Sequence, residues 1–254
     1  MSKLKTFFLL LAFIPVSLPA QQDSVRSGAY EWKTAIPIVD KISSSIVLNG
    51  MVHDFKWMQI TSSVITSPKK IKQHVAPSYE QLIIIKSGSL KITFNGTAYN
   101  LTANSVAVLF PGQKYTIRKT GKGAVEFFSM QYTSKKPADA ARGGKSFVKI
   151  WEDIPFKPNN NGGGRRDFFE QSTPMQKRFE MHVTTLKEGL KSHEPHTHRA
   201  EEIVWILEGE TEMQMGNEIV KTAVGGFYYL GSNVPHAIKN IGTKPATYFA
   251  FQFE

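Results

Sequence analysis

The residues best suited to chemistry are three histidines and one glutamate near the end of the chain: His196, His198, Glu202 and His236. His196 and His198 are two positions apart, so their side chains would point the same way on an extended segment. Glu202 follows four residues later, and His236 opens a further strand-like segment after a turn. Imidazole and carboxylate groups bind divalent first-row metals. The spacing predicts a metal site inside a β-barrel.

The ligand set limits the choice of ion. Three nitrogen donors and one oxygen donor leave two neighbouring positions open on an octahedral ion, which favours Mn(II) or Fe(II) over a closed structural zinc. Ni, Zn and Cu remain alternatives because imidazole binds each of them. Without a cation, four ionisable groups in an apolar interior would be costly to desolvate. We therefore expect one divalent metal ion.

Short strands must position these ligands. From about residue 35 the chain consists of short β-branched and aromatic runs separated by Gly, Asn and Pro, which predicts an antiparallel all-β fold. If Glu202 points inward, alternation places Val204 and Ile206 inside the barrel and Trp205 outside. Residues 21–30 are predicted to form a loose tail, and residues 157–167, rich in Gly and Asn, a mobile loop.

The two halves of the chain are repeats. A shift of 121 residues places Gly88 on Gly209 and Leu109 on Leu230, without a gap from Ile85 to Gly121. We predict two domains, residues 31–133 and 148–254, joined by a linker at 134–147. In this register the four ligand positions of the first half hold no strong metal ligand: they are Val75, Pro77, Gln81 and Tyr115.

The stretch from Gly189 to Gly209 resembles the first motif of the cupin superfamily. It has the HxH pair of His196 and His198, with Glu202 four residues after the second histidine. The interval between Gly189 and His196 is one residue longer than is usual in that motif. The resemblance implies an all-β chain of two tandem cupin barrels (double-stranded β-helix or jelly-roll), with a metal set only in the C-terminal one.

Residues 226–240 are similar to the second cupin motif. His236 and Asn240 occupy its HxxxN positions, and Gly231 and Asn233 stand where a proline and a glycine are usual. The layout of two barrels with one metal resembles ureidoglycine aminohydrolase, but the ligand set differs from that family. It is more similar to cupin dioxygenases such as quercetinase, and to single-barrel cupins that act on sugar acids or keto acids.

A second group of polar residues lies on one predicted strand. Arg178, Glu180 and His182 alternate, so they share one face. If that face lines the pocket, Arg178 is expected to bind a substrate carboxylate and Glu180 or His182 to transfer protons. If it faces solvent, all three are ordinary surface residues. Arg165 and Arg166 follow three glycines, and are either an anion-binding lid or part of a solvated loop.

Residues 1–20 are predicted to be a secretory signal peptide. They contain two lysines, an apolar run from Phe7 to Leu18 and a small residue at Ala20, and the run is too short to cross a membrane. Cleavage near Ala20 would place the protein in the periplasm or outside the cell. The chain contains no cysteine, so export brings no disulfide.

The net charge of +10 is spread along the chain without interleaved aromatic residues. That pattern argues against nucleic acid and favours a small anionic ligand, although a basic surface without a partner explains it equally well. Pairing of two copies through Trp205, Phe249 and Phe251 is one expectation for oligomerisation; contact between the two barrels of one chain is the other.

These features leave three classes of function. The first is an enzyme that acts on a small oxygen-rich acid or sugar acid at the metal, either an isomerase, lyase or hydrolase or a dioxygenase of the quercetinase kind. The second is a non-catalytic binder of a sugar or organic acid in which the metal is an anchor. The third is a storage protein, which is disfavoured because such bicupins often lose the metal set.

Overall fold

The computed structural model describes residues 24–254, so the predicted signal peptide lies outside the described residues. The described part contains twenty strands and one short 3₁₀ helix, η1 (Trp151–Asp153), which confirms the all-β prediction. No helix within it has the length and apolar character needed to cross a membrane.

Each half of the chain forms a barrel from a large and a small sheet. The first barrel pairs a six-stranded sheet, in the order β11-β8-β5-β10-β3-β2, with a four-stranded sheet, β4-β9-β6-β7. Its strands are β2 (Ser43–Gly50), β3 (Phe55–Ile65), β4 (Ile71–His74), β5 (Glu80–Ser87), β6 (Leu90–Phe94), β7 (Thr97–Leu101), β8 (Val106–Leu109), β9 (Lys114–Lys119), β10 (Val125–Ser134) and β11 (Phe147–Lys149).

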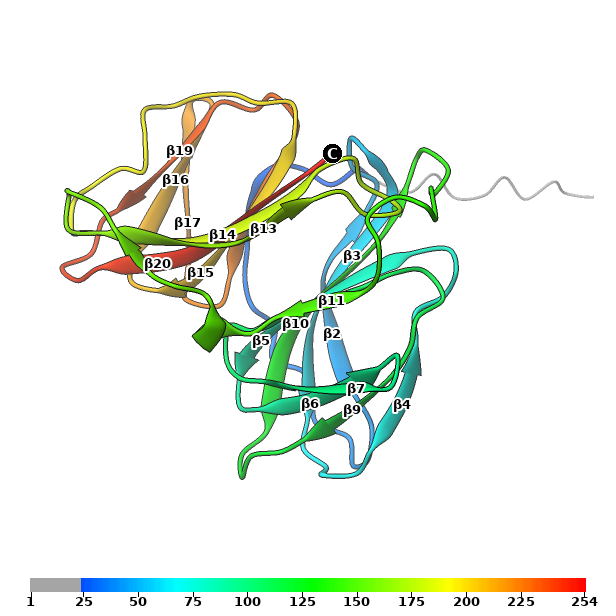
Figure 1. The fold of residues 1–254 in the computed structure, drawn as a ribbon. Helices are drawn as coiled ribbons and strands as arrows, with labels where there is room; N and C mark the ends of the chain where they lie inside the picture. Colours follow the sequence, from blue (N-terminus) through cyan, green and yellow to red (C-terminus); the bar gives the residue numbers. More distant parts are fainter. Residues whose placement is uncertain (1–23) are drawn as a thin grey trace, which may run out of the picture.

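The second barrel pairs a seven-stranded sheet, β1-β18-β15-β20-β14-β13-β12, with a three-stranded sheet, β17-β16-β19. Its strands are β1 (Gly28–Tyr30), β12 (Lys157–Pro158), β13 (Gly164–Gln171), β14 (Phe179–Leu186), β15 (Glu201–Glu208), β16 (Thr211–Met215), β17 (Glu218–Thr222), β18 (Phe227–Leu230), β19 (His236–Asn240) and β20 (Ala246–Phe253). In Figure 1 the small sheets lie at the outer ends of the molecule, and the large sheets lie between them.

The large sheets pack against each other through an inter-barrel core of aromatic and aliphatic side chains. Because side chains alternate along a strand, Val204 and Ile206 of β15 fill the second barrel, whereas Trp205 points into the inter-barrel core, as predicted. Trp205 lies 5.5 Å from Phe128 of the first barrel between ring centroids. Phe249 and Phe251 are buried in the same core, so these aromatic residues make their contact within one chain.

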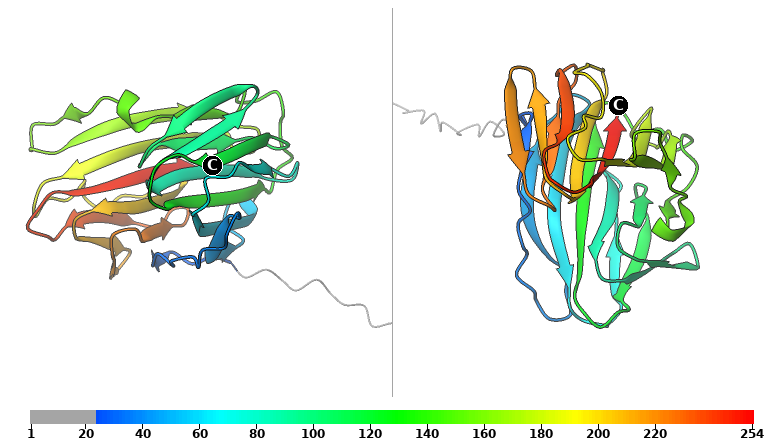
Figure 2. Two further views of the ribbon diagram at one scale, coloured as in Figure 1. Left: turned by 90° about the horizontal axis from the view of Figure 1, so that it is seen from below. Right: turned by 90° about the vertical axis from the view of Figure 1, so that its left-hand side faces the viewer.

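The barrels also exchange their first strands. β1, from the start of the described chain, pairs with β18 of the second barrel, and β11, which follows the predicted linker, pairs with β8 of the first. Figure 2 shows the blue N-terminal segment against the orange strands of the second barrel. The prediction of a loose tail at residues 21–30 was therefore wrong for Gly28–Tyr30. The backbone of this segment pairs with the edge of the large sheet of the second barrel.

Two buried carboxylates tie each barrel to a loop of the other. Glu80 of β5 accepts a hydrogen bond from the backbone N–H of Met175 at 2.7 Å. Glu201 of β15, its equivalent in the repeat, accepts from the backbone N–H groups of His53 at 2.8 Å and Asp54 at 3.1 Å. Both carboxylates are fully buried. Glu80 thus faces the inter-barrel core, as its position one residue off the ligand register indicates.

Residues 157–171 form a hairpin of β12 and β13, so the prediction of a mobile loop at 157–167 was wrong. The Asn159 side chain closes the turn by accepting the backbone N–H groups of Asn161 at 3.1 Å and Gly163 at 2.9 Å. Gly163 lies so close to the carbonyl oxygen of Thr185 that a Cβ there would clash. The glycines permit close packing onto β14 and place Arg165 on a strand.

Candidate metal centre

The four predicted ligands meet at one end of the second barrel. Glu202 lies at the start of β15 and His236 at the start of β19, whereas His196 and His198 lie in the loop that precedes β15. The extended segment expected for these two histidines is a loop rather than a regular strand. They converge because His196 forms an isolated antiparallel bridge with His236, through backbone hydrogen bonds of 3.2 and 3.0 Å.

The turn before His236 contains a residue in the left-handed region. Asn233, which replaces the usual glycine, has a φ of 60°. Asparagine tolerates this left-handed region better than most residues. The turn is therefore formed without a glycine at this position.

The ligand atoms of these side chains are close to one another. The nitrogens of His196, His198 and His236 lie within 4.8 Å of one another, and among residues 24–254 they form the one such group of three or more metal-binding side chains. Glu202 Oε2 lies 3.0 Å from His198 Nε2 and 3.2 Å from His236 Nε2. Adjacent donors that bind one ion at about 2.1 Å are separated by about 3 Å.

The hydrogen bonds on the far side of two rings fix which nitrogen carries the proton. His198 Nδ1 donates to the carbonyl of Ala200 at 2.7 Å, and His236 Nδ1 donates to the carbonyl of Val234 at 2.8 Å. In the neutral rings Nε2 is then an acceptor, and it faces the acceptor oxygen of Glu202. His236 Nε2 is buried and has no hydrogen-bond partner. Two acceptors opposite a carboxylate call for a cation between them, and a divalent ion fits this donor set.

The electrostatics of the group lead to the same conclusion. Burial alone would raise the pKa of Glu202, but the adjacent imidazoles of His198 and His236 outweigh it and hold that pKa well below its ordinary value. The Glu202 carboxylate raises the pKa of His198 against the effect of burial. Burial, with the neighbouring imidazoles, lowers the pKa of His196. Glu202 is therefore an anion at neutral pH and suited to bind a cation.

Sequence reasoning missed Gln252, which touches this centre. Its Nε2 lies 3.3 Å from His198 Nε2 and 3.4 Å from Glu202 Oε2. Arg178 Nη1 donates to Gln252 Oε1 at 2.9 Å, which turns the amide nitrogen toward the ligands. Alternation along β20 places Tyr248, Ala250 and Gln252 on one face, and this pattern was the signal that could have found Gln252.

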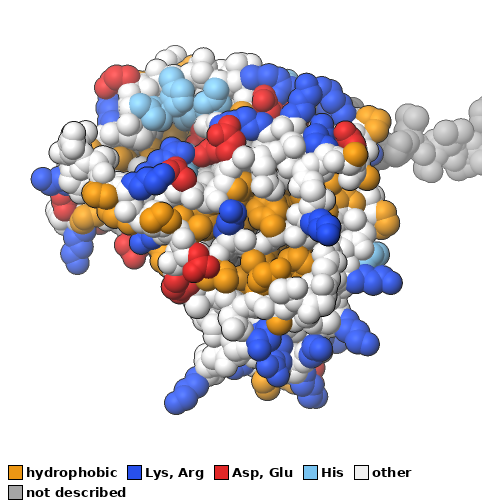
Figure 3. All heavy atoms as spheres, viewed as in Figure 1, with side chains coloured by type: hydrophobic (Ala, Val, Ile, Leu, Met, Phe, Trp, Pro, Cys, Tyr) orange, Lys and Arg blue, Asp and Glu red, His pale blue; other side chains and the backbone are white. Residues whose placement is uncertain are grey.

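A cavity of about 300 Å³ adjoins the ligands inside the second barrel. His182 and Thr184 of β14 line it, so the polar face of that strand is turned toward the pocket. Glu180 accepts a hydrogen bond from His182 Nδ1 at 2.7 Å and another from Arg165 Nη2 at 2.9 Å. Figure 3 shows histidine side chains gathered at the surface of this barrel beside basic and acidic groups.

The predicted arginines lie in different places. Arg178 pairs with Glu170 at 2.7 Å and with Gln252, and it is not among the residues that line the cavity. Arg165 lines the cavity from β13, as part of its wall. Arg166, next to it on the same strand, lies with its guanidinium 4.5 Å from the ring centroid of Trp151. The two arginines therefore do not act together as a lid.

The equivalent positions of the first barrel are joined by neutral hydrogen bonds. Tyr115 donates its hydroxyl to Gln81 Oε1 at 3.0 Å, and Gln81 Nε2 donates to Ser129 Oγ at 2.9 Å. Burial raises the pKa of Tyr115 and so keeps its hydroxyl protonated. In this barrel hydrogen-bond donors and acceptors are matched without a cation.

Comparison with known proteins supports the fold. Residues 182–251 match the family described as a Cupin domain. A search of curated protein sequences found no match. Among solved structures, AerE from Microcystis aeruginosa is similar with a TM-score of 0.66 and 17% identity, over 89% of this chain and 99% of that one.

Two further structures have the same architecture. Oxalate decarboxylase from Lactobacillus farciminis, in a formate complex, is similar with a TM-score of 0.65 and 11% identity, over 92% of this chain and 88% of that one. Vicilin from Corylus avellana is similar with a TM-score of 0.64 and 9% identity, over 88% and 83% of the two chains. The chain therefore has a two-barrel cupin fold, and the match to the Cupin domain lies in its second barrel.

Proposed function

We propose that this protein is an exported metalloenzyme that acts on a small carboxylic acid or sugar acid in its second barrel. One divalent ion, Mn(II) or Fe(II) before Ni, Zn or Cu, would be held by His196, His198, Glu202 and His236. The observation that carries the proposal is the pair of Nε2 acceptors that face the Glu202 carboxylate at 3.0 and 3.2 Å. When bound, such an ion supplies Lewis acidity toward a substrate oxygen.

His182 is the group we assign to proton transfer. Its Nδ1–H is held by Glu180, which leaves Nε2 as the basic nitrogen of a ring that lines the cavity. Glu180 is a positioning residue, because it fixes the tautomer and direction of that ring. This arrangement of a carboxylate behind a histidine is the way in which acid–base catalysts are commonly oriented.

Arg165 is the group we assign to recognition of a substrate carboxylate. It lies on the cavity wall, and planar guanidinium groups bind carboxylates through two parallel hydrogen bonds. Arg178, the residue expected from the sequence, is assigned a positioning role through Gln252. With a divalent ion present the cavity would have a positive potential, which favours an anionic ligand.

The other walls of the cavity are apolar. Val204, Met213 and Ile238 line it together with the polar residues. Such walls limit the number of water molecules around a bound substrate and strengthen its polar contacts. A solved structure with this fold is an oxalate decarboxylase, and by analogy of fold this supports a small carboxylate as substrate.

Metal analysis tests the first half of the proposal. We expect the purified full chain to hold one divalent ion, and His196→Ala to lose it while circular dichroism shows an unchanged β-fold. Gln81→Leu, at the equivalent position of Glu202 in the first barrel, is the matched control and should keep the full metal content. A stoichiometric ion in His196→Ala would refute the ligand assignment.

A substrate screen tests the second half. Small acids and sugar acids are screened for an increase in Tm, and those that bind are incubated with the metal-loaded enzyme with and without oxygen. Anaerobic turnover that falls by about 10²–10⁴ in kcat in His182→Asn supports an isomerase, lyase or hydrolase. Turnover only with oxygen would instead indicate a dioxygenase, and binding without turnover in either atmosphere would indicate a binder.

A further inference from the structure

The first barrel contains a cavity of its own. It has a volume of about 450 Å³ and lies in the position that the metal cavity occupies in the second barrel. Strands β2, β3, β4, β5, β9 and β10 contribute polar residues to it, and Ile83, Leu90 and Ile117 are among its apolar residues. Interiors are normally close-packed, and an open space of this size is costly in a barrel whose role is structural alone.

The repeat shows how this cavity differs from the metal cavity. Each ionisable residue that lines the metal cavity from β13, β14, β15 or β19, and Glu180 beside His182, is replaced in the first barrel by an uncharged hydrogen-bonding residue. With the shift of 121 residues the replacements are Ser44 for Arg165, Gln59 for Glu180, Thr61 for His182, Gln81 for Glu202 and Tyr115 for His236. The first barrel has thus kept polar groups in the same places while losing charge.

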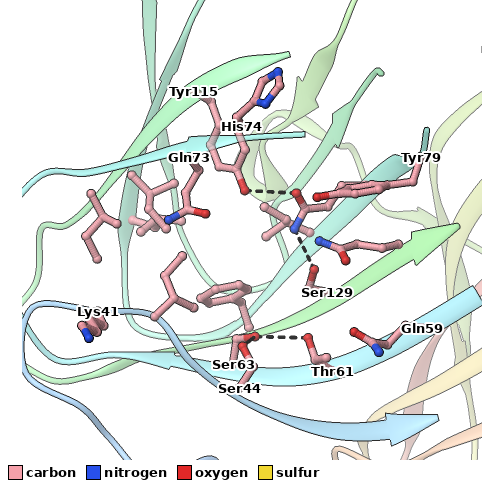
Figure 4. Close-up of a pocket in the computed structure, with 18 of the residues that line it drawn as sticks. Lys41, Ser44, Gln59, Thr61, Ser63, Gln73, His74, Tyr79, Tyr115 and Ser129 are labelled. Atoms are coloured by element: carbon pink, nitrogen blue, oxygen red, sulfur yellow. Dashed lines mark hydrogen bonds between the residues drawn. The ribbon is translucent and has the colours of Figure 1, made fainter. Parts of the chain in front are cut away.

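The hydroxyl and amide groups form two facing sets, shown in Figure 4. On one side Ser63 Oγ lies 2.8 Å from Ser44 Oγ and 3.3 Å from Thr61 Oγ1. On the other side Tyr115, Gln81 and Ser129 are linked in a row by hydrogen bonds of 3.0 and 2.9 Å. Hydroxyl groups both donate and accept, so these rows can exchange internal bonds for bonds to a ligand's hydroxyls.

The charged groups near this cavity lie toward its entrance. Asp40 forms an ion pair with Lys69, which balances the negative charge of Asp40. Lys41 and His74 also border the cavity and are exposed. Tyr79 and Tyr115 present aromatic surface to the interior, where the C–H face of a sugar ring could pack. Neutral hydroxyls, amides and aromatic faces match an uncharged polyhydroxylated molecule.

We propose that the first barrel is a binding site for a neutral sugar or polyol, separate from the metal centre. Its ligand lies among Ser44, Thr61, Ser63, Gln81 and Tyr115. An anion is disfavoured there because its charge would face hydroxyls and amides, and Lys41, the lysine that borders the cavity, is exposed to solvent. This site does not depend on the proposed function of the second barrel.

Isothermal titration calorimetry of the full chain tests the proposal, with D-glucose, D-galactose, L-arabinose and myo-inositol as probes and D-glucuronate as the charged comparator. We expect at least one neutral probe to bind with a Kd in the millimolar range or below, and D-glucuronate to bind this site more weakly. Thr61→Val with Ser63→Ala should weaken the neutral probe about tenfold or more, since two hydrogen-bonding groups are removed.

Two variants separate this site from the metal centre. Thr184→Val makes a similar change at the position equivalent to Ser63 in the second barrel, and His196→Ala removes a metal ligand; both should leave sugar binding unchanged. If the double variant does not fold, Ser44→Ala is the milder test and should weaken binding in the same direction. The proposal is overturned if none of the four neutral probes binds, or if binding survives the first-barrel variants and is lost in Thr184→Val or His196→Ala.

Discussion

Gln252 is the uncharged residue that bears most directly on the metal ligands. Its amide lies 3.3 Å from His198 Nε2 and 3.4 Å from Glu202 Oε2, and it orients the carboxylate by donating to it. Partners of this kind typically contribute 10–100-fold to metal affinity. We predict that Gln252→Ala weakens Mn(II) binding by about tenfold or more, as measured by competition with a chelator.

The matched control is Gln131→Ala, because Gln131 is the equivalent of Gln252 in the first barrel and lines the cavity of that barrel. Its Mn(II) affinity should equal that of the wild type. Equal Mn(II) affinities for Gln252→Ala and the wild type would show that the Gln252 amide does not contribute to metal binding.

At this scale the sequence predicted the four side chains that converge at the candidate metal centre, but not all of their surroundings. The ligands stand out because histidine and glutamate are informative at fixed spacing. Gln252 and Arg165 do not, since a glutamine among aromatic residues and an arginine after glycines are common on protein surfaces. Their roles depend on strand pairing: β14 brings β13 to one side of the site and β20 to the other.

At the scale of the elements, Glu201 is the strongest link between the barrels. Its buried carboxylate accepts the backbone N–H groups of His53 and Asp54 and the hydroxyl of Tyr229. Glu201→Ala would leave three donors without an acceptor, each at about 1–3 kcal/mol. We predict a loss of at least about 3 kcal/mol in unfolding free energy by urea denaturation, against no measurable change for the exposed Glu218→Ala.

A loss below about 1 kcal/mol in Glu201→Ala would mean that water replaces these hydrogen bonds and that the carboxylate does not tie the barrels together.

Glu80 predicts a pH dependence of stability. Burial raises the pKa of Glu80 above the usual 4.5, and hydrogen bonds from Tyr132 and Met175 oppose only part of this effect. The folded protein therefore holds this proton more tightly than the unfolded chain, and the contribution of Glu80 to stability falls as pH rises from 4.5 through the raised pKa.

Glu80→Gln removes this titration. Its unfolding free energy, measured between about pH 4 and pH 7, should fall less with rising pH than that of the wild type. Parallel curves for the two proteins would contradict the raised pKa. Glu218→Gln, on the exposed surface, is the control and should follow the wild type.

The strands rich in β-branched and aromatic residues were predictable, including β14, β15, β18 and β20. The exchanged strands β1 and β11 were not, because each is three residues long and its partner lies far away in the sequence. The hairpin of β12 and β13 was not predicted because its Gly and Asn content is typical of a loop. The close packing of Gly163 against Thr185 is evident only in the structure.

At the scale of the whole molecule, the two barrels share one core. The large sheets bury Phe128, Trp205 and Phe251 against each other, and β1 and β11 belong to sheets of opposite barrels. We therefore predict a single cooperative unfolding transition, in which tryptophan fluorescence and circular dichroism coincide. Mn(II) bound at the proposed site in the second barrel should raise the Tm of the whole molecule.

Phe128→Ala, in the first barrel, should lower the unfolding free energy of the whole molecule by about 3–5 kcal/mol, as expected for a large cavity in a core. Two separate transitions, with only one shifted by Mn(II), would show that the barrels are independent.

The most direct measurement is an anomalous difference map from crystals of the full chain grown with Mn(II). The account predicts one strong peak within bonding distance of the imidazoles of His196, His198 and His236 and the carboxylate of Glu202, with no peak beside Gln81 or Tyr115. A map with no peak among these four side chains, or with an equal peak in the first barrel, would contradict it.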